Sequence, residues 1–138
     1  MIVLDASAAV ELLLGTRIGA QVAARLQADG GPAHAPHLLD VEVASALRRG
    51  VARRVVAETR AAEALEDLRD LAVVRYPHGP LLARVWELRA RMSPYDGVYV
   101  ALAEQLGAPL VTRDARLGRA GGHGARVEIL GLTTGQAK

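Results

Sequence analysis

Two stretches far apart in the chain, Ile2-Val3-Leu4-Asp5 and Leu110-Val111-Thr112-Arg113-Asp114, each carry an acidic residue at the end of a short apolar run. Short runs of branched apolar residues predict buried β-strands. In open α/β sheets, ligand sites form at the carboxyl ends of the strands. We therefore expect Asp5 and Asp114 to lie at one edge of a sheet, where a ligand could bind.

The rest of the chain alternates β-branched runs with longer helical segments, which predicts a parallel sheet covered by helices. Strands are expected near 2–5, 33–36, 73–76, 110–113 and 127–130. Helices are expected near 7–14, 17–29, 38–50, 56–71, 80–92, 95–106 and 115–120. The predicted fold class is α/β: one domain over residues 1–138, with a central, mainly parallel five-stranded sheet flanked by about seven helices.

The composition limits the class of protein. A chain of 138 residues with 51% hydrophobic content fits one domain with a sizeable core. The absence of cysteine excludes disulfides and thiolate zinc sites, and makes the cytoplasm the expected compartment. No apolar stretch approaches the roughly 20 residues of a membrane span. The aromatic content of 3% argues against a stacking platform for single-stranded bases.

Asp96 lies on the predicted helix 95–106, on the same face as Tyr99, Val100 and Ala103. Its carboxylate therefore projects along an apolar stripe. A lone buried carboxylate must be protonated, paired, hydrogen-bonded or bound to a cation.

Glu42 lies inside the predicted helix 38–50, at the margin of its apolar face. Asp40 flanks the opposite margin. Periodicity alone therefore does not choose between these two acids as the residue that faces the predicted site.

Three of the acids also have structural explanations. Ser93-Pro94-Tyr95-Asp96 has the form of a capping box, and Asp5 and Asp114 could each cap the helix that follows. However, three acids on one predicted rim with a fourth on a neighbouring helix would repel one another, so that without a cation at least one should hold a proton. Their coincidence favours a site for magnesium or manganese, which prefer oxygen ligands.

The histidines, Trp86 and the arginines have simpler structural explanations. His34 and His37 are three residues apart in a Pro-flanked segment without convincing further ligands, so zinc is disfavoured and a loop role is expected. Trp86 is expected in the core. The net charge of +2 is carried almost entirely by arginine, for which a biased genome is the simpler explanation than selection for nucleic acid.

The densest basic patch contains Arg48, Arg49, Arg53 and Arg54, which could hold the phosphates of a nucleic acid or could simply form a solvated helix end. Arg113 is closer to the predicted chemistry, but could instead pair with one of its acids.

Four segments match in order and spacing: Ile2 to Ala8, Leu38 to Val43, Tyr95 to Ala103 and Leu110 to Asp114. Taken together, they resemble the PIN-domain family, specifically the VapC-type ribonuclease toxins of type II toxin–antitoxin systems. Their order and spacing span nearly the whole chain. The segment from about Val51 to Pro80 carries no such motif and could contain determinants of substrate choice.

The resemblance implies a Mg²⁺- or Mn²⁺-dependent endoribonuclease in which Asp5, Glu42, Asp96 and Asp114 form the acidic set, which selects Glu42 over Asp40. It implies supporting roles for Ser7 and Thr112, which could orient a carboxylate or a metal-bound water. It also implies a homodimer and a cognate VapB-type antitoxin.

Three other classes of protein share some of these features. A phosphoacceptor receiver domain also gathers acids at strand ends, but it needs a lysine near the site, and the only lysine is Lys138. A catalytically inactive PIN-fold module that binds RNA or a partner, and a nuclease acting on another nucleic acid, remain as alternatives that metal titration and substrate competition would separate.

Overall fold

Five short strands form one fully parallel sheet in the order β3-β2-β1-β4-β5. The computed structural model of the protein describes residues 1–131. The strands lie within one residue of their predicted bounds: β1 (Ile2–Leu4), β2 (Ala33–Pro36), β3 (Val73–Tyr76), β4 (Leu110–Thr112) and β5 (Val127–Ile129). The prediction of a central five-stranded sheet is confirmed, and the sheet is parallel throughout.

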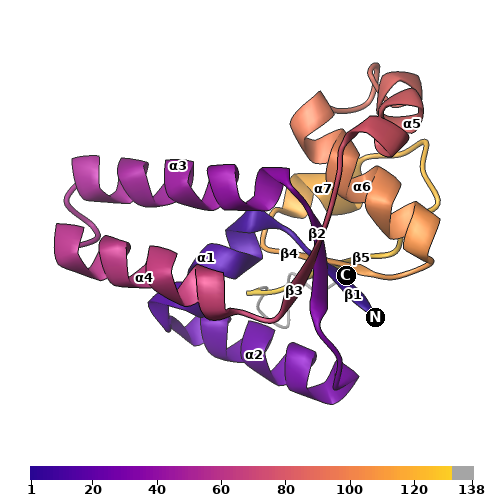
Figure 1. The fold of residues 1–138 in the computed structure, drawn as a ribbon. Coiled ribbons are helices and arrows are strands. Elements are labelled where there is room, and N and C mark those ends of the chain that lie inside the picture. Colours follow the sequence, from indigo (N-terminus) through magenta and orange to yellow (C-terminus); the bar gives the residue numbers. More distant parts are fainter. Residues whose placement is uncertain (132–138) are drawn as a thin grey trace.

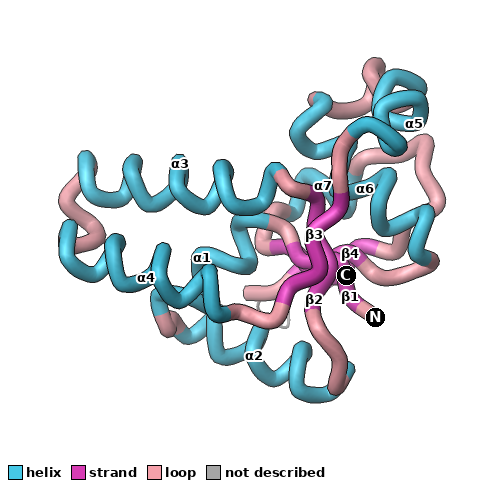
Figure 2. The backbone as a smooth tube through the Cα atoms, in the orientation of Figure 1, coloured by secondary structure: helices cyan, strands magenta, loops and turns pink. Residues whose placement is uncertain are grey.

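Helices cover both faces of this sheet and give the fold three layers (Figure 1). One layer contains α1 (Ala6–Leu14), α2 (Arg17–Asp29), α3 (Leu38–Ala52) and α4 (Glu58–Asp70). The other contains α5 (Leu82–Glu87), α6 (Pro94–Leu106) and α7 (Ala115–Arg119), with a short 3₁₀ turn η1 (Gly79–Leu81) before α5. Figure 2 shows the two groups of helices on either side of the strands. Within residues 1–131, no helix is both long and apolar enough to cross a membrane.

The chain changes direction across the sheet between β1 and β4. From β1 it moves outward through β2 to β3, and it then returns to place β4 on the other side of β1. The amide of Asp5 donates to the carbonyl of Val111 at 3.2 Å, which joins the carboxyl ends of β1 and β4. Ligands of open α/β sheets bind at such a point of reversal.

Helix α6 forms the centre of the second layer. Every residue from Gly97 to Ala103 is buried, because the helix packs on β1, β2 and β4 and is covered by α5. Gly97 permits this close packing, since a Cβ added there would lie 3.3 Å from a methyl group of Val85. Asp96 is therefore the last polar residue before a fully buried helix segment.

Three predictions need correction. The helix expected over 80–92 is α-helical only to Glu87, and continues as tight turns in which the amides of Arg89 and Arg91 bond three residues back. Trp86 is not in the core: it is 67% exposed, and the guanidinium of Arg89 lies 4.6 Å from its ring centre. His34 is not in a loop: it lies buried in β2 and contacts the Tyr76 hydroxyl at 2.7 Å.

Candidate active site

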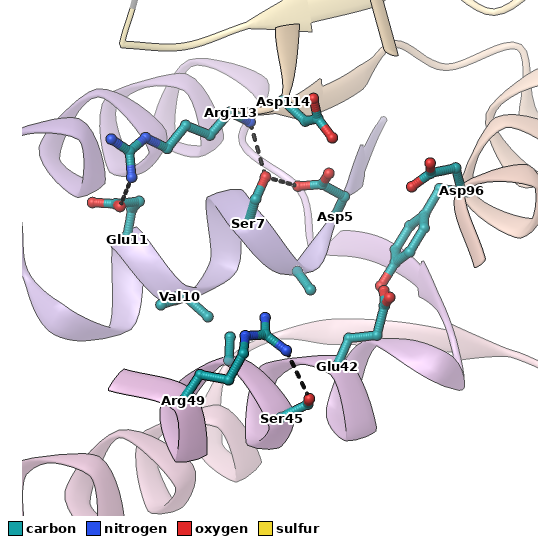
Figure 3. A pocket seen from close by; sticks show the side chains of 13 residues that line it. Asp5, Ser7, Val10, Glu11, Glu42, Ser45, Arg49, Asp96, Arg113 and Asp114 are labelled. Atoms are coloured by element: carbon teal, nitrogen blue, oxygen red, sulfur yellow. Dashed lines mark hydrogen bonds and ion pairs between the residues drawn. The ribbon is translucent and has the colours of Figure 1, made fainter. Parts of the chain in front are cut away.

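A hollow of about 380 Å³ lies at the carboxyl edge of the sheet, where β1 and β4 end. All four acids of the predicted set, Asp5, Glu42, Asp96 and Asp114, line it. Figure 3 shows their carboxylates converging on this space from the ends of two strands and from helices α3 and α6. The structure thus brings the four side chains together, while their catalytic role stays a prediction.

Asp5 is the buried centre of the site, with 7% of its surface exposed. Its Oδ1 accepts hydrogen bonds from the Ser7 hydroxyl at 2.7 Å and from the Ala8 amide at 3.1 Å. Its Oδ2 accepts from the Thr112 hydroxyl at 2.5 Å. Ser7 and Thr112 are therefore placed where they hold the Asp5 carboxylate in one orientation.

The same two hydroxyls also fix the loop that carries the next acid. The Ser7 hydroxyl accepts a hydrogen bond from the Arg113 amide at 3.0 Å, and the Thr112 hydroxyl accepts one from the Asp114 amide at 2.9 Å. One small network thus links the ends of β1 and β4, and positions Asp5 and Asp114 relative to each other.

Burial raises the pKa of three of the four carboxyls. It is the largest cause for Asp5, whose pKa is raised further by the charge of Asp114 and held down in part by its hydrogen bonds. It is also the largest cause for Glu42 and for Asp96, and charges of the other pocket acids add to it. The charged form of these three carboxyls is therefore disfavoured, and a bound cation would stabilise it.

Asp114 behaves differently, because a cation already accompanies it. Arg116 donates to both of its carboxylate oxygens, with Nη2 to Oδ2 at 2.6 Å, and this pairing lowers the pKa of Asp114. The same Nη2 lies 3.9 Å from Oδ2 of Asp96. Arg116 therefore partly neutralises one side of the acidic set.

The capping explanations hold alongside the pocket. Asp5 caps α1 and Asp114 caps α7 through their side chains, and the Ser93 hydroxyl accepts from the Asp96 amide at 3.2 Å. Capping satisfies backbone amides but leaves the like charges uncompensated. Helix capping therefore explains where these residues stand in the chain, and does not by itself explain why they meet.

The arginines that the sequence offered as phosphate-binding candidates occupy different positions. Arg49 and Arg113 line the pocket, where Arg49 donates to Ser45 at 2.9 Å and Arg113 pairs with Glu11 at 2.6 Å (Figure 3). Arg113 thus pairs with none of the four acids. Arg48 is exposed on α3 and does not line the pocket.

Three contributors were missed by the sequence reasoning. Glu11 holds Arg113, and lies one helical turn after Ser7, a spacing that could have placed it on the pocket side of α1. Arg116 follows Asp114 by two residues, and nothing in the local pattern marks it. The Tyr99 hydroxyl is buried beside Glu42, and burial together with the charge of Glu42 raises the pKa of Tyr99.

The donor set fits a divalent cation with oxygen preference. The pocket is lined by five carboxylates, of which Glu11 is paired with Arg113, and its lining within the described chain includes no histidine. In residues 1–131, no three acidic or histidine side chains are already close enough to share one ion. Mg²⁺ keeps several waters and needs only one or two carboxylates, so the pocket suits it without such a cage.

Comparison with known proteins places the chain in a family. The PIN domain family matches residues 2–122, so the protein belongs to the PIN-domain family. Within it, the chain is of the VapC type: it is 46% identical over 130 residues to Ribonuclease VapC12 of Mycobacterium tuberculosis, covering 94% of this chain and 99% of the relative. It is also 46% identical over 121 residues to Ribonuclease VapC9 of the same organism, covering 88% and 91%.

Two solved structures share the fold. PAE2754 from Pyrobaculum aerophilum matches with a TM-score of 0.60 and 25% identity, over 84% of this chain and 76% of the other. VapBC2 from Rickettsia felis, bound to a DNA fragment from its promoter, matches with a TM-score of 0.66 and 12% identity, over 94% and 99%. The predicted PIN-like fold is confirmed.

Proposed function

We propose that this protein is a Mg²⁺- or Mn²⁺-dependent endoribonuclease and the toxin of a toxin–antitoxin pair. One observation carries the proposal: four carboxylates from four separate segments meet in one pocket, and within residues 1–131 neither Asp5 nor Glu42 has an ion-pair partner. Membership of the VapC-type PIN family, whose relatives named above are ribonucleases, supports the nuclease class.

Asp5 and Asp96, with Glu42 and Asp114 beside them, are the residues that would hold the metal. A bound divalent cation lowers the pKa of a bound water and neutralises charge on the attacked phosphate. The chain supplies the rest of the arrangement. Ser7 and Thr112 keep the Asp5 carboxylate in one orientation, so that little reorganisation is needed when a cation and the substrate arrive.

The arginines on the pocket wall would hold the RNA backbone. Glu11 fixes the guanidinium of Arg113, and Ser45 contacts that of Arg49, on the α1 and α3 side of the hollow. Guanidinium groups suit phosphate oxygens because they present several donors in one plane. Arg49 and Arg113 would thereby orient a strand whose scissile phosphate lies over the carboxylates.

The nucleophile would be water and not the ribose 2′-hydroxyl. The pocket lining described for residues 1–131 has no histidine, the usual general acid or base of a 2′-hydroxyl pathway. Hydrolysis by water leaves 5′-phosphate and 3′-hydroxyl ends. Recovery of 2′,3′-cyclic phosphate from the purified enzyme would contradict this part of the proposal.

The decisive experiment is cleavage of total cellular RNA by the purified protein with Mg²⁺ or Mn²⁺, compared with EDTA and with an Asp96→Asn variant prepared identically. We expect cleavage that needs the metal and is lost in the variant. Equal cleavage by both proteins would indicate contamination or a wrong site, and no cleavage by either would favour an inactive binding module.

The proposed partners are an RNA substrate, a VapB-type antitoxin and a second copy of the chain. The VapC-type family supports the antitoxin, and one solved protein of the same fold is a VapBC complex. Light scattering of the purified protein should give the mass of two chains. Addition of the antitoxin should form a complex and suppress RNA cleavage, and failure to do either would contradict the assignment.

A further inference from the structure

A second hollow, of about 290 Å³, lies next to the carboxylate pocket. Asp96 lines both hollows, so the two adjoin. The charges differ: the pocket gathers acids, whereas the second hollow contains two arginines, Arg91 and Arg116, against the single acid Asp96. Arg116 is also paired with Asp114, so Arg91, which has no ion pair in residues 1–131, is the charge that would attract an anion to this hollow.

Arg116 is held in place with donors to spare. Its Nε and Nη2 donate to Asp114 at distances from 2.6 to 3.2 Å, while its Nη1 makes no hydrogen bond within residues 1–131. The side chain is 72% exposed. Asp114 thus fixes one edge of the planar guanidinium, and the remaining N–H groups are available to a ligand.

Arg91 is seated on a glycine pair. A Cβ added to Gly122 would lie 3.1 Å from Arg91 Nε, and one added to Gly121 would lie 3.3 Å from Nη1. Gly122 also has φ +83°, a conformation that other residues rarely adopt. The loop is tied down, because Arg84 donates to the Gly122 carbonyl at 3.1 Å. Within the described chain, no carboxylate pairs with Arg91.

We propose that this second hollow is a phosphate subsite, in which Arg91 and Arg116 bind the RNA phosphate next to the scissile one. Two guanidinium groups match the oxygens of one phosphate, and charge-assisted bonds of this kind are strong. The exposed Ser93, also in the lining, can donate its hydroxyl to the same anion. The inference rests on the proposed ribonuclease function, and adds the direction in which the strand leaves the acidic pocket.

The test measures RNA binding without turnover. In a Glu42→Gln background, which leaves the second hollow unaltered, fluorescence anisotropy gives the Kd of a labelled 12-nucleotide single-stranded RNA across a salt series with Mg²⁺ present. We expect Arg91→Gln and Arg116→Gln each to weaken binding about five- to twentyfold. Each should also reduce the slope of log K against log salt by about 0.7, the value for one lost phosphate contact on single strands.

The matched control is Arg126→Gln. Arg126 is 74% exposed, close to the 72% of Arg116, and it lies just before β5, in the lining of a separate hollow that does not include the pocket acids. Its substitution should leave the slope unchanged. If Arg91→Gln has the slope of this control, the subsite is disproved.

A second variant guards against misfolding. If Arg116→Gln does not fold, then Arg91→Gln decides, because Arg91 is exposed and has no ion pair within residues 1–131. Failure of the subsite and failure of the nuclease proposal are distinguishable. A reduced salt slope in both variants, with no cleavage by the wild type, would support the subsite alone. Cleavage by the wild type with unchanged slopes in both variants would support the nuclease alone.

Discussion

Asp40 and Glu42 lie two residues apart on helix α3 and have opposite surroundings. Asp40 accepts two hydrogen bonds from Arg75, at 2.8 and 2.9 Å, on the β3 side of the helix. Glu42 turns into the pocket among other acids, where burial raises its pKa. The same helix therefore carries one carboxylate that stabilises the fold and one that the fold alone does not satisfy.

The contrast extends to the whole molecule. Away from the pocket, Glu104 is paired with Arg84, and Glu128 with Arg25, each by two hydrogen bonds, and these pairings lower the pKa of both carboxyls. Among the acids of residues 1–131 that are not exposed, only Asp5 and Glu42 therefore lack an ion-pair partner. Carboxyls whose pKa is raised by burial and by neighbouring charges cluster at functional sites.

The largest effect should come from removing the charge of one of these two neighbours, Glu42, and the other serves as its control. We predict that Glu42→Gln lowers RNA cleavage by at least about 100-fold, since losing roughly 2.7 kcal/mol of transition-state stabilisation gives that factor. Asp40→Asn, its matched control on the same helix, should stay within about twofold of the wild type. Initial rates with Mn²⁺ measure both, and equal losses would remove the functional distinction between the two residues.

The sequence predicted the strands and helices closely, because each apolar run was bounded by glycine, proline or a capping residue. It could not choose between Asp40 and Glu42, since both flank the apolar face of one helix and the choice depends on Arg75, which β3 brings from 35 residues away. Trp86 was misplaced for a related reason: α5 is short, and Val85 instead of Trp86 is the residue packed on Gly97.

The site was predictable where a residue sat at the end of a strand, as for Asp5 and Asp114. It was less so for groups that act through side-chain pairing. Arg116 binds Asp114, and Glu11 binds Arg113, although these last two residues are 102 positions apart in the chain. The pairing of Glu11 with Arg113 is set by packing of segments that are distant in the chain, so no local spacing specifies it.

The second prediction concerns metal binding as a stability effect. At 100 times its Kd, a ligand of the folded state adds about 2.7 kcal/mol. For a domain of this size, that raises Tm by about 10 °C. Mn²⁺ should produce such a rise in the wild type and in Asp40→Asn, and a much smaller one in Asp96→Asn. Scanning calorimetry with and without Mn²⁺ measures it; an equal rise in Asp96→Asn would place the ion elsewhere.

The third prediction is that Asp96→Asn and Asp40→Asn change the stability of the metal-free protein in opposite directions. A carboxyl with a raised pKa in the folded state binds a proton that the unfolded chain has released, so stability falls as pH rises through that folded pKa. At pH 7, Asp96→Asn should therefore be more stable than the wild type and have a higher Tm. Asp40→Asn should be less stable by up to about 1 kcal/mol, because its ion pair is partly exposed.

Thermal unfolding in EDTA between pH 4 and 8 checks these signs. The wild type should lose stability relative to Asp96→Asn as pH rises through the folded pKa of Asp96, which lies above the ordinary value of 3.8. If Asp96→Asn were instead destabilised across this range, the carboxylate would be a net contributor to the fold, as Asp40 is.

The smallest expected effect concerns Arg116, which lies in ion-pair range of two of the four acids. Its guanidinium lies 2.6 Å from Asp114 and 3.9 Å from Asp96, so it competes with a divalent cation for the same charges. Because the pair with Asp114 is exposed, with Arg116 largely in solvent, we expect Arg116→Gln to tighten Mn²⁺ binding only about threefold. Titration calorimetry of the RNA-free protein measures this, with Arg126→Gln as the control. Weaker Mn²⁺ binding in Arg116→Gln would mean that Arg116 orients Asp114 for the metal, a role opposite to that of the arginine beside Asp40.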